Sequence, residues 1–344
     1  MHWVISLAVL GGVLLLSSLF LLYQFSPAAF TSTPRPSVAS ERQYRSILSD
    51  QARPLPSIND DHDDSIKLTV IVPAYNEETR LPLMLDEALA HLSKNYSSDA
   101  YEILIVDDGS KDATFSRALE FAKENSDRGG KNIRVVKLAK NRGKGGAVTH
   151  GMMHSRGKRM LFVDADGASR FEDLALLEKA MDDMCSDTSS NGHTPNGLKA
   201  GVNSGAKAIA IGSRAHMVKT DAVVKRSKLR NLLMRSFHIY LSVLGIRSIA
   251  DTQCGFKLFT RSIAREIFPN MHVEGWIFDI EILIIASLLD TKSDPVKMRE
   301  VPIQWREVEG SKMDLIKDSI SMAVDLLVIR ASYALGRWNV KRVA

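Results

Sequence analysis

The sequence predicts an α/β fold with a doubly wound, mostly parallel sheet, preceded by a transmembrane helix and followed by amphipathic helices. From Lys67 onward, short β-branched runs alternate with helix-like segments, the pattern of a parallel sheet packed against helices. Several of these runs are apolar without alternation, as expected for strands covered on both faces. Residues 3–25 are almost wholly apolar, which predicts the membrane helix.

Six runs are predicted as the strands of this sheet. They are Leu68–Val72, Tyr101–Val106, Ile133–Leu138, Met160–Val163, Ala208–Ile211 and Glu300–Ile303. The helix-like segments between them include Arg80–Leu92 and Ala113–Lys123. In open α/β sheets, ligands bind outside the carboxyl ends of the strands, so functional residues are expected just past these runs.

Charge and cysteine content narrow the class of protein only slightly. The chain has 344 residues and a formal net charge of +5. This mild excess fits contact with anionic phosphates or lipid head groups, and it fits an inert basic surface equally well. We expect no nucleic-acid partner, and the sequence gives no indication of an oligomeric state. Cys185 and Cys254 suggest neither a disulfide framework nor a zinc site, and reduced thiols are expected.

The apolar segment from Trp3 to Phe25 is predicted to be an uncleaved anchor, residues 1–25. Its length matches the roughly 20 residues that span a bilayer. A cleaved signal peptide would have a basic region before a shorter apolar stretch, whereas no Lys or Arg precedes this span. Arginines follow it at Arg35, Arg42, Arg45 and Arg53. The positive-inside rule therefore predicts a single-pass protein with its bulk in the cytosol.

The remaining chain divides into four predicted parts. Residues 26–66 have scattered Pro and Ser and an acidic run, and are predicted to be a solvated tether. Residues 67–312 form the catalytic domain, with a polar surface insertion at 186–207. Residues 313–344 form a helical segment, in which the pattern from Met313 to Trp338 fits a membrane-associated helix and a helix packed on the domain equally well.

Two motifs with carboxylates follow the first two predicted strands. Pro73-Ala74-Tyr75-Asn76-Glu77 offers a ring face and a carboxylate that accepts hydrogen bonds from ribose hydroxyls. Asp107-Asp108-Gly109-Ser110 offers a carboxylate for a base or a ribose. Taken alone, each is more typical of an ordinary turn that leads into a helix.

A third motif, Asp164-Ala165-Asp166, follows the strand Met160–Val163. Carboxylates two residues apart on extended backbone project to the same side. At a strand end they are suited to a hard divalent cation, with a diphosphate supplying further oxygen ligands. An isolated D-x-D pair is common by chance, but the strand and the two companion motifs favour the metal site.

Basic and glycine-rich segments complete the set of candidate motifs. Asn141-Arg142-Gly143-Lys144-Gly145-Gly146-Ala147 opens a helix, where backbone N–H groups and Lys144 can face an anion. It lacks the ending of a P-loop, and a plain glycine-rich turn also fits. Farther on lie Gly212-Ser213-Arg214, a basic cluster between Lys225 and Arg230, and the segment Asp251 to Lys257. A basic cluster fits either a solvated helix face or an anionic lipid head group.

In this order and spacing, the motifs from Leu68 to Lys312 resemble family 2 of the inverting glycosyltransferases, which have the Rossmann-like GT-A fold. Four segments are similar to the branch of that family that glucosylates dolichyl phosphate for protein N-glycosylation: Asp164–Ser169, Asp251–Lys257, Trp276–Glu281 and Trp305–Lys312. They are also similar to the sister branch, which uses GDP-mannose. The resemblance implies UDP-glucose as donor, dolichyl phosphate as acceptor, Mg²⁺ or Mn²⁺ as cofactor, and a place at the endoplasmic reticulum membrane, in contact with lipid.

The resemblance also implies three sets of site residues. The nucleotide-sugar pocket is expected to contain Pro73, Tyr75, Glu77, Asp107 and Lys144. The metal and the diphosphate are expected to be bound by Asp164 and Asp166. The charge of the acceptor phosphate is expected to be matched by Arg214, Arg230, Lys257 and Lys312.

Further residues bear on catalysis and on the choice of sugar. Asp251 is counted among the catalytic residues, and it and Asp279 are expected to help orient the reactants, with neither assigned as a general base. The mannose branch carries a glutamine, a further metal ligand, two residues after the second aspartate, whereas this chain has Ala168. This departure implies a metal held by fewer protein ligands and leans away from mannose.

Two other classes of function remain open from the sequence. The run Phe162 to Gly167 also resembles the opening motif of haloacid-dehalogenase-type phosphatases, with Asp164 as the nucleophile. That interpretation leaves the motifs at Pro73 and Asp107 without a role. A membrane-tethered scaffold without activity is the third class, and loss of either D-x-D carboxylate would have indicated it. Both are present.

Overall fold

The computed structural model describes residues 11–13, 16–17, 36–60, 65–186, 205–219, 249, 251–308 and 315–342. Within these ranges, no helix combines the length and the apolarity needed to cross a membrane. The predicted anchor lies outside them except for 11–13 and 16–17, and so does most of the predicted insertion at 186–207. Arg230 and Lys312 also lie outside the described residues.

A nine-stranded mixed sheet forms the centre of the described part of the chain, in the order β2-β1-β5-β4-β3-β6-β8-β7-β9. The strands are β1 Gln43–Ser46, β2 Ser49–Pro54, β3 Leu68–Ala74, β4 Tyr101–Asp107, β5 Ile133–Lys137, β6 Arg159–Val163, β7 Lys207–Ser213, β8 Phe256–Thr260 and β9 Val296–Pro302. Strands β5, β4, β3 and β6 are parallel, and so are β7 and β9. Strand β8 is antiparallel to both β6 and β7, so the sheet is mixed rather than mostly parallel.

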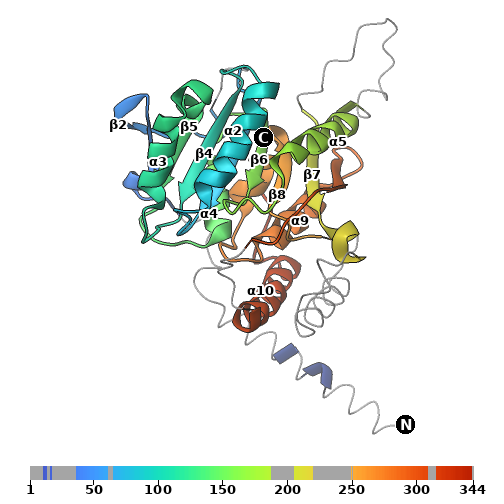
Figure 1. The fold of residues 1–344 in the computed structure, drawn as a ribbon. Helices are drawn as coiled ribbons and strands as arrows, with labels where there is room; N and C mark the ends of the chain where they lie inside the picture. The colour runs from blue at the N-terminus through green and yellow to red at the C-terminus, as the bar shows by residue number, and fades with distance from the viewer. Residues whose placement is uncertain are drawn as a thin grey trace, which may run out of the picture.

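Helices cover both faces of this sheet (Figure 1). The described α-helices are α2 Leu81–Asn95, α3 Thr114–Glu124, α4 Lys144–Met153, α5 Leu174–Ser186, α8 Arg261–Ile267, α9 Phe278–Leu289 and α10 Leu315–Ala334. Short 3-10 turns lie at Ala39–Arg42, Ser126–Arg128, Gly130–Asn132, Phe171–Asp173, Ala215–Lys219 and Phe268–Asn270. Helices α2, α3 and α5 pack on one face, and α4, α8 and α9 pack on the other.

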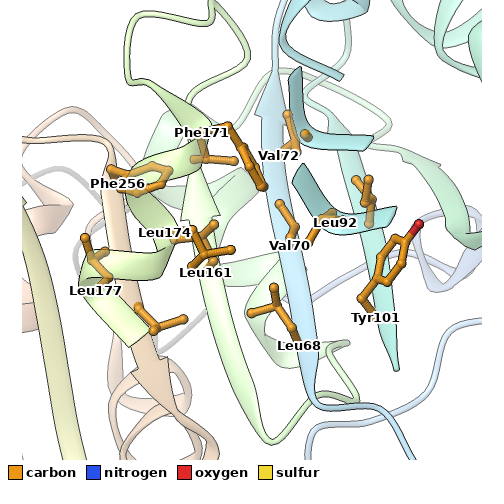
Figure 2. Packing of buried hydrophobic residues seen from close by; sticks show 14 of the residues in the cluster. Leu68, Val70, Val72, Leu92, Tyr101, Leu161, Phe171, Leu174, Leu177 and Phe256 are labelled. Atoms are coloured by element: carbon orange, nitrogen blue, oxygen red, sulfur yellow. The ribbon is translucent and has the colours of Figure 1, made fainter. Parts of the chain in front are cut away.

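The central strand β3 shows why its sequence is apolar without alternation. Its successive side chains point to opposite faces, so Val70 and Val72 join the core beneath α2 and α5, whereas Ile71 joins the core beneath α4. Figure 2 shows the first of these cores, where Leu161 of β6 and Phe171 lie with the β3 side chains. Both faces are closed to water, which leaves the loops at the strand ends as the place for a polar site.

The six predicted strands each overlap an observed strand, and the two predicted helices correspond to α2 and α3. Strand β8 was not predicted. All five of its residues are buried, Lys257 among them, and a lysine in a strand covered on both faces hides the apolar signal. The antiparallel part of the sheet was therefore missed.

The described part of the predicted tether is folded onto the domain, which corrects that prediction. Strands β1 and β2 form a hairpin, and Arg45 of β1 pairs with Val135 of β5 at the sheet edge. Glu41 accepts a hydrogen bond from the backbone N–H of Ala139, and Ile58 is fully buried in the core. The hairpin covers an edge that would otherwise expose unpaired backbone groups. The catalytic domain thus begins well before residue 67.

The C-terminal helix α10 packs on the domain through its second half. Leu326 and Ile329 are fully buried, and Tyr333 donates a hydrogen bond to Glu281 of α9. Just beyond the helix, the ring of Trp338 stacks on His272 with ring centroids 4.0 Å apart. The interpretation of residues 313–338 as a helix on the domain therefore holds for their described part, and contact with a membrane remains a prediction.

Candidate active site

The loops after β3 and β4 are joined to each other at the carboxyl edge of the sheet. Asn76 has a φ of 54°, a left-handed conformation that lets its backbone N–H donate to Ser110 Oγ at 2.9 Å. Its side-chain oxygen accepts the N–H of Lys111 at 2.8 Å. The backbone N–H of Glu77 donates to Thr114 Oγ1 at 2.7 Å. These bonds place the first two predicted motifs in one surface.

Within the first motif, Glu77 is held by Arg80. The guanidinium donates to both carboxylate oxygens, at 2.7 and 2.6 Å, so the charge of this buried carboxylate is balanced inside the protein. Pro73, near the end of β3, and Tyr75, just past it, are half-buried. Three of the five predicted pocket residues thus lie within one short segment, and the structure adds Arg80 as a partner that the sequence did not identify.

Asp107, at the end of β4, has one carboxylate oxygen in use and one available. It is fully buried, and its Oδ1 accepts the N–H of Ser110 at 2.9 Å. Its Oδ2 makes no hydrogen bond within the described residues, and Lys137 Nζ lies 3.7 Å away. A buried carboxylate oxygen left without a donor is costly. A ligand N–H would satisfy it, as the prediction of a base-binding role requires.

The adjacent Asp108 fastens the glycine-rich loop to the strand end. Its two carboxylate oxygens accept the backbone N–H groups of Arg142 at 2.7 Å and Gly143 at 2.8 Å. Burial raises the pKa of Asp108 to about 7, although these two hydrogen bonds oppose the rise. Gly143 has a φ of 90°, which favours glycine, and Arg142 pairs with Glu274 at 2.5 Å. Lys144 follows directly as the first residue of α4.

The D-x-D pair lies just past β6, beside Lys144 and β8. The backbone N–H of Asp164 donates to the carbonyl of Gly255 at 3.1 Å. Lys144 Nζ contacts both Asp164 oxygens, at 2.7 and 3.0 Å. Asp166 accepts the N–H of Ala168 at 3.0 Å. Burial, reinforced by the charge of Asp164, raises the pKa of Asp166 above its usual range.

The site offers two carboxylates, those of Asp164 and Asp166, as candidate metal ligands. Among the described residues, no group of three or more His, Cys, Asp or Glu side chains is arranged to hold an ion. Ala168 occupies the position at which the sister branch carries a further ligand. Two hard oxygen donors fit Mg²⁺ or Mn²⁺ when a diphosphate and water complete the coordination. The bound Lys144 ammonium shows that the Asp164 carboxylate accepts a cation in this position.

Lys257 lies inside the protein, away from the surface at which an acceptor phosphate would bind. It is fully buried, and its Nζ donates to Asp279 at 2.6 Å and to the carbonyl of Cys254 at 2.7 Å. The expected direct contact with an acceptor phosphate is therefore wrong for this structure. Lys257 instead neutralises Asp279 beneath the D-x-D pair.

Asp251 holds Arg214. The Arg214 guanidinium donates to both oxygens of Asp251, at 2.7 and 2.8 Å, and lies 5.4 Å from the centre of the Trp305 ring. Burial acts to raise the pKa of Asp251, but the hydrogen bonds and charge of Arg214 outweigh it and hold the pKa below the ordinary value. A carboxylate with a low pKa is a poor general base, so Asp251 positions Arg214 rather than accepting a proton.

Besides Arg80, sequence reasoning left three contributors out of the predicted site. Asp108 stood in a quoted motif but received no role, although two adjacent aspartates before a glycine-rich loop were a usable signal. Gly255 leaves no room for a side chain, since a Cβ there would lie 2.1 Å from Asp164 Oδ2. Glu274 pairs with Arg142 across 132 residues, and no local pattern indicates that contact.

Comparison with known proteins shows which class of enzyme this protein belongs to. The model of glycosyl transferase family 2 matches residues 69–268. The chain belongs to this family of glycosyltransferases, and it has a GT-A-like α/β fold with a mixed sheet.

Particular relatives carry a more specific name. A dolichyl-phosphate beta-glucosyltransferase of Saccharomyces cerevisiae is 47% identical, covering 94% of this chain and 92% of that protein. Relatives of the same name are 42% identical in Dictyostelium discoideum and 40% identical in Homo sapiens. Each of these two alignments covers 98% of this chain, and they cover 94% and 97% of the respective relatives. Among solved structures, glucosyl-3-phosphoglycerate synthase from Mycobacterium tuberculosis with UDP is 15% identical, covering 78% of this chain and 80% of that chain with a TM-score of 0.48.

The contact between Gly255 and Asp164 leads to a prediction. The variant Gly255→Ala forces its Cβ against the Asp164 carboxylate, and transfer activity is expected to fall by about 100-fold, since a displacement near 1 Å can cost that much. Steady-state kinetics with a thermal melting curve measures this. Gly275→Ala is the matched control, because a Cβ there meets nothing within 4 Å. Equal activity of the two variants would contradict the placement of Asp164.

Proposed function

We propose that this enzyme transfers glucose from UDP-glucose to dolichyl phosphate with inversion, giving dolichyl β-D-glucosyl phosphate. The observation that carries the proposal is that Asp107 and the D-x-D pair lie at the same carboxyl edge of the sheet. Asp107 offers a buried oxygen to a base, and Asp164 and Asp166 offer two carboxylates to a metal-bound diphosphate. The relatives named dolichyl-phosphate beta-glucosyltransferase, at 40% to 47% identity, support the choice of donor and acceptor.

The uridine end of the donor is proposed to lie over the joined loops after β3 and β4. Uracil presents one ring N–H, and Asp107 Oδ2 is a buried acceptor for it. Pro73 and Tyr75 offer apolar surface beside this oxygen, and Glu77 with Arg80 forms the nearby polar border. Strand register fixes the distance from this pocket to the D-x-D pair, because β4, β3 and β6 are neighbours in the sheet.

The diphosphate is proposed to lie between the D-x-D pair and the start of α4. When bound, Mg²⁺ or Mn²⁺ supplies Lewis-acid stabilisation of the departing diphosphate. The chain's own contribution is the placement of Asp164 and Asp166 as ligands, with Lys144 and the first N–H groups of α4 facing the anion. Asp108 keeps this loop in position through the backbone of Arg142 and Gly143.

The acceptor needs little help from a base. A monoesterified phosphate has its second pKa at about 6, so its oxygen is already anionic near neutral pH. The protein must hold it in line with the anomeric carbon and balance two anions. Arg214, oriented by Asp251 and stacked over Trp305, is the described cation proposed for this role. Arg230 and Lys312 remain predictions from family resemblance.

Family membership and the geometry of the site argue against two alternative functions, a phosphatase and an inactive scaffold. A phosphatase with Asp164 as nucleophile belongs to another family, and this carboxylate is bound by Lys144 and backed by Gly255. An inactive scaffold would not require both D-x-D carboxylates in place. GDP-mannose stays the nearest competing donor, and Ala168 together with the names of the relatives supports glucose.

The membrane setting is proposed from the sequence and the acceptor. Residues 1–25 are proposed to anchor the protein in the endoplasmic reticulum membrane, with the catalytic domain in the cytosol and residues 313–344 at the membrane surface. Helix α10 supports the last point. It exposes Val324, and Leu335 just past its end is exposed as well, while its buried side packs on the domain. Met322 contacts Gln253 near the acceptor segment.

The donor and acceptor are tested directly by offering the purified full chain radiolabelled UDP-glucose or GDP-mannose at equal concentration with dolichyl phosphate and Mg²⁺ or Mn²⁺. We expect glucosyl transfer, and we expect Asp166→Ala or EDTA to abolish it because a metal ligand is lost. Thermal melting checks that the variant is folded. Efficient mannosyl transfer without glucosyl transfer would refute the proposed sugar.

The uracil contact is tested by Asp107→Asn. The amide keeps Oδ1 for Ser110 but turns a donor toward the ring N–H, so UDP affinity measured by calorimetry is expected to fall by about tenfold. Asp99→Asn, an exposed change just before β4, is the matched control and should leave the affinity within about twofold. Unchanged UDP binding in the Asp107 variant would place the base elsewhere.

The orientation is tested by protease protection in sealed microsomes, with tags on both ends of the chain. We expect the catalytic domain and the C-terminal tag to be digested from outside, because the arginines after residue 25 favour the cytosolic side. Protection of the whole domain until detergent is added would reverse this orientation.

A further inference from the structure

Lys144 makes the closest described contact to the D-x-D pair. Its ammonium contacts Asp164 Oδ1 at 2.7 Å and Oδ2 at 3.0 Å, so it engages both oxygens of that carboxylate. The contact is partly open to solvent, since the two side chains are 18% and 29% exposed. It can therefore be exchanged for another cation from outside without unfolding the surrounding core.

The backbone around Lys144 is fixed, which limits where its ammonium can go. Asp108 binds the two residues before it, and a Cβ on Gly145 would lie 2.5 Å from Phe278 Cβ. The Trp276 ring centre lies 6.0 Å from Lys144 Nζ. With its start held and one side bounded by an aromatic ring, the side chain moves mainly over the D-x-D pair and the space in front of α4.

A metal ion on Asp164 would use the same oxygen electron pairs as this ammonium. Both are cations, so they repel each other when they approach the same carboxylate. Asp279 does not relieve the repulsion, because Lys257 already neutralises it. Two carboxylates and one ammonium remain at the front of the site, which carries one net negative charge.

We infer that Lys144 is an exchangeable counterion, which occupies Asp164 and passes to the donor's diphosphate as the metal takes its place. This inference rests on the proposed function for the identity of the diphosphate. A divalent ion alone would leave the front of the site with a net positive charge and a displaced ammonium. A divalent ion together with a diphosphate gives that ammonium an anion to bind. Metal and donor therefore bind cooperatively, and Lys144 is the residue that couples them.

The test measures Mn²⁺ binding to the purified full chain by the electron paramagnetic resonance signal of free Mn²⁺, without and with UDP. For Lys144→Met, Mn²⁺ alone is expected to bind at least about tenfold more tightly than to the natural chain, because the competing ammonium is gone. The tightening of Mn²⁺ binding by UDP is expected to shrink by a similar factor. Lys144→Arg, which keeps the charge, is expected to stay close to the natural chain in both measurements.

Lys140→Met is the matched control, since it removes an exposed positive charge four residues earlier. Its Mn²⁺ affinity should stay within about twofold. If Lys144→Met binds Mn²⁺ no more tightly than the natural chain, or if Lys140→Met has the same effect, the inference is overturned. An absence of Mn²⁺ binding by the natural chain in the presence of UDP also overturns it.

These outcomes separate the inference from the proposed function. Glucosyl transfer by the natural chain with unchanged Mn²⁺ affinity in Lys144→Met would sink the exchange and leave the proposed activity standing. Tighter Mn²⁺ binding in the variant, with no transfer of glucose by the natural chain, would support the exchange and refute the proposed activity.

Discussion

The antiparallel pairing of β8 with β6 is the constraint on which the active site depends. It sets Phe162 opposite Lys257 and Val163 opposite Phe256, and it continues as the bond from Asp164 N–H to the Gly255 carbonyl. The first aspartate of the D-x-D pair is thus held by a neighbouring strand rather than by a free loop. Because the Asp164 carboxylate lies so close, a Cβ at residue 255 would displace it. One pairing therefore fixes the Asp164 carboxylate and the glycine behind it.

The same pairing explains why a lysine is tolerated in a fully buried strand. The Lys257 ammonium is buried, where it donates hydrogen bonds to Asp279 and to the Cys254 carbonyl, and the Phe162 ring centre lies 5.2 Å away. Removing one partner of a buried pair is costly, because the other charge is left without compensation. Lys257 and Asp279 therefore depend on each other, since loss of either one would leave the other charge buried and unpaired. This arrangement places a fixed, internally balanced pair of charges beneath the D-x-D pair, and fixed charges of this kind need no reorganisation during a reaction.

The fold was predictable from the sequence to the extent that its signals are local. Apolar runs such as Leu68–Val72 identify β3, and the clustering of motifs past Ala74, Asp107 and Val163 follows from parallel neighbours ending at one edge. Contacts between distant segments were not predictable in this way. The family resemblance implied a phosphate-binding role for Lys257, and only the position of α9 shows that Asp279 meets it.

The prediction of a tether before residue 67 failed for a related reason. Proline and serine between residues 26 and 58 indicate a solvated chain, and a two-stranded hairpin is marginal when isolated. Its stability comes from the edge of β5 and from the buried Ile58, neither of which a local pattern reveals. Glu41 extends the hairpin's role toward the site, because it binds the backbone of Ala139, and Arg142 lies 3.8 Å away. The segment that links the domain to the predicted anchor thus contacts the loop that carries Lys144.

Helix α9 contacts both the active site and the C-terminal helix α10. Its first turn carries Asp279, the partner of Lys257, and Glu281, which accepts the backbone N–H groups of His272 and Val273. Glu281 also accepts the hydroxyl of Tyr333 on α10. A displacement of α10 would therefore disturb the Glu281 carboxylate. That carboxylate holds the backbone of His272 and Val273, which leads directly to Glu274 and Trp276. Glu274 in turn pairs with Arg142, two residues before Lys144. The packing of α10 is therefore linked to the start of α4 through Glu281, the short chain from Val273 to Glu274, and Arg142.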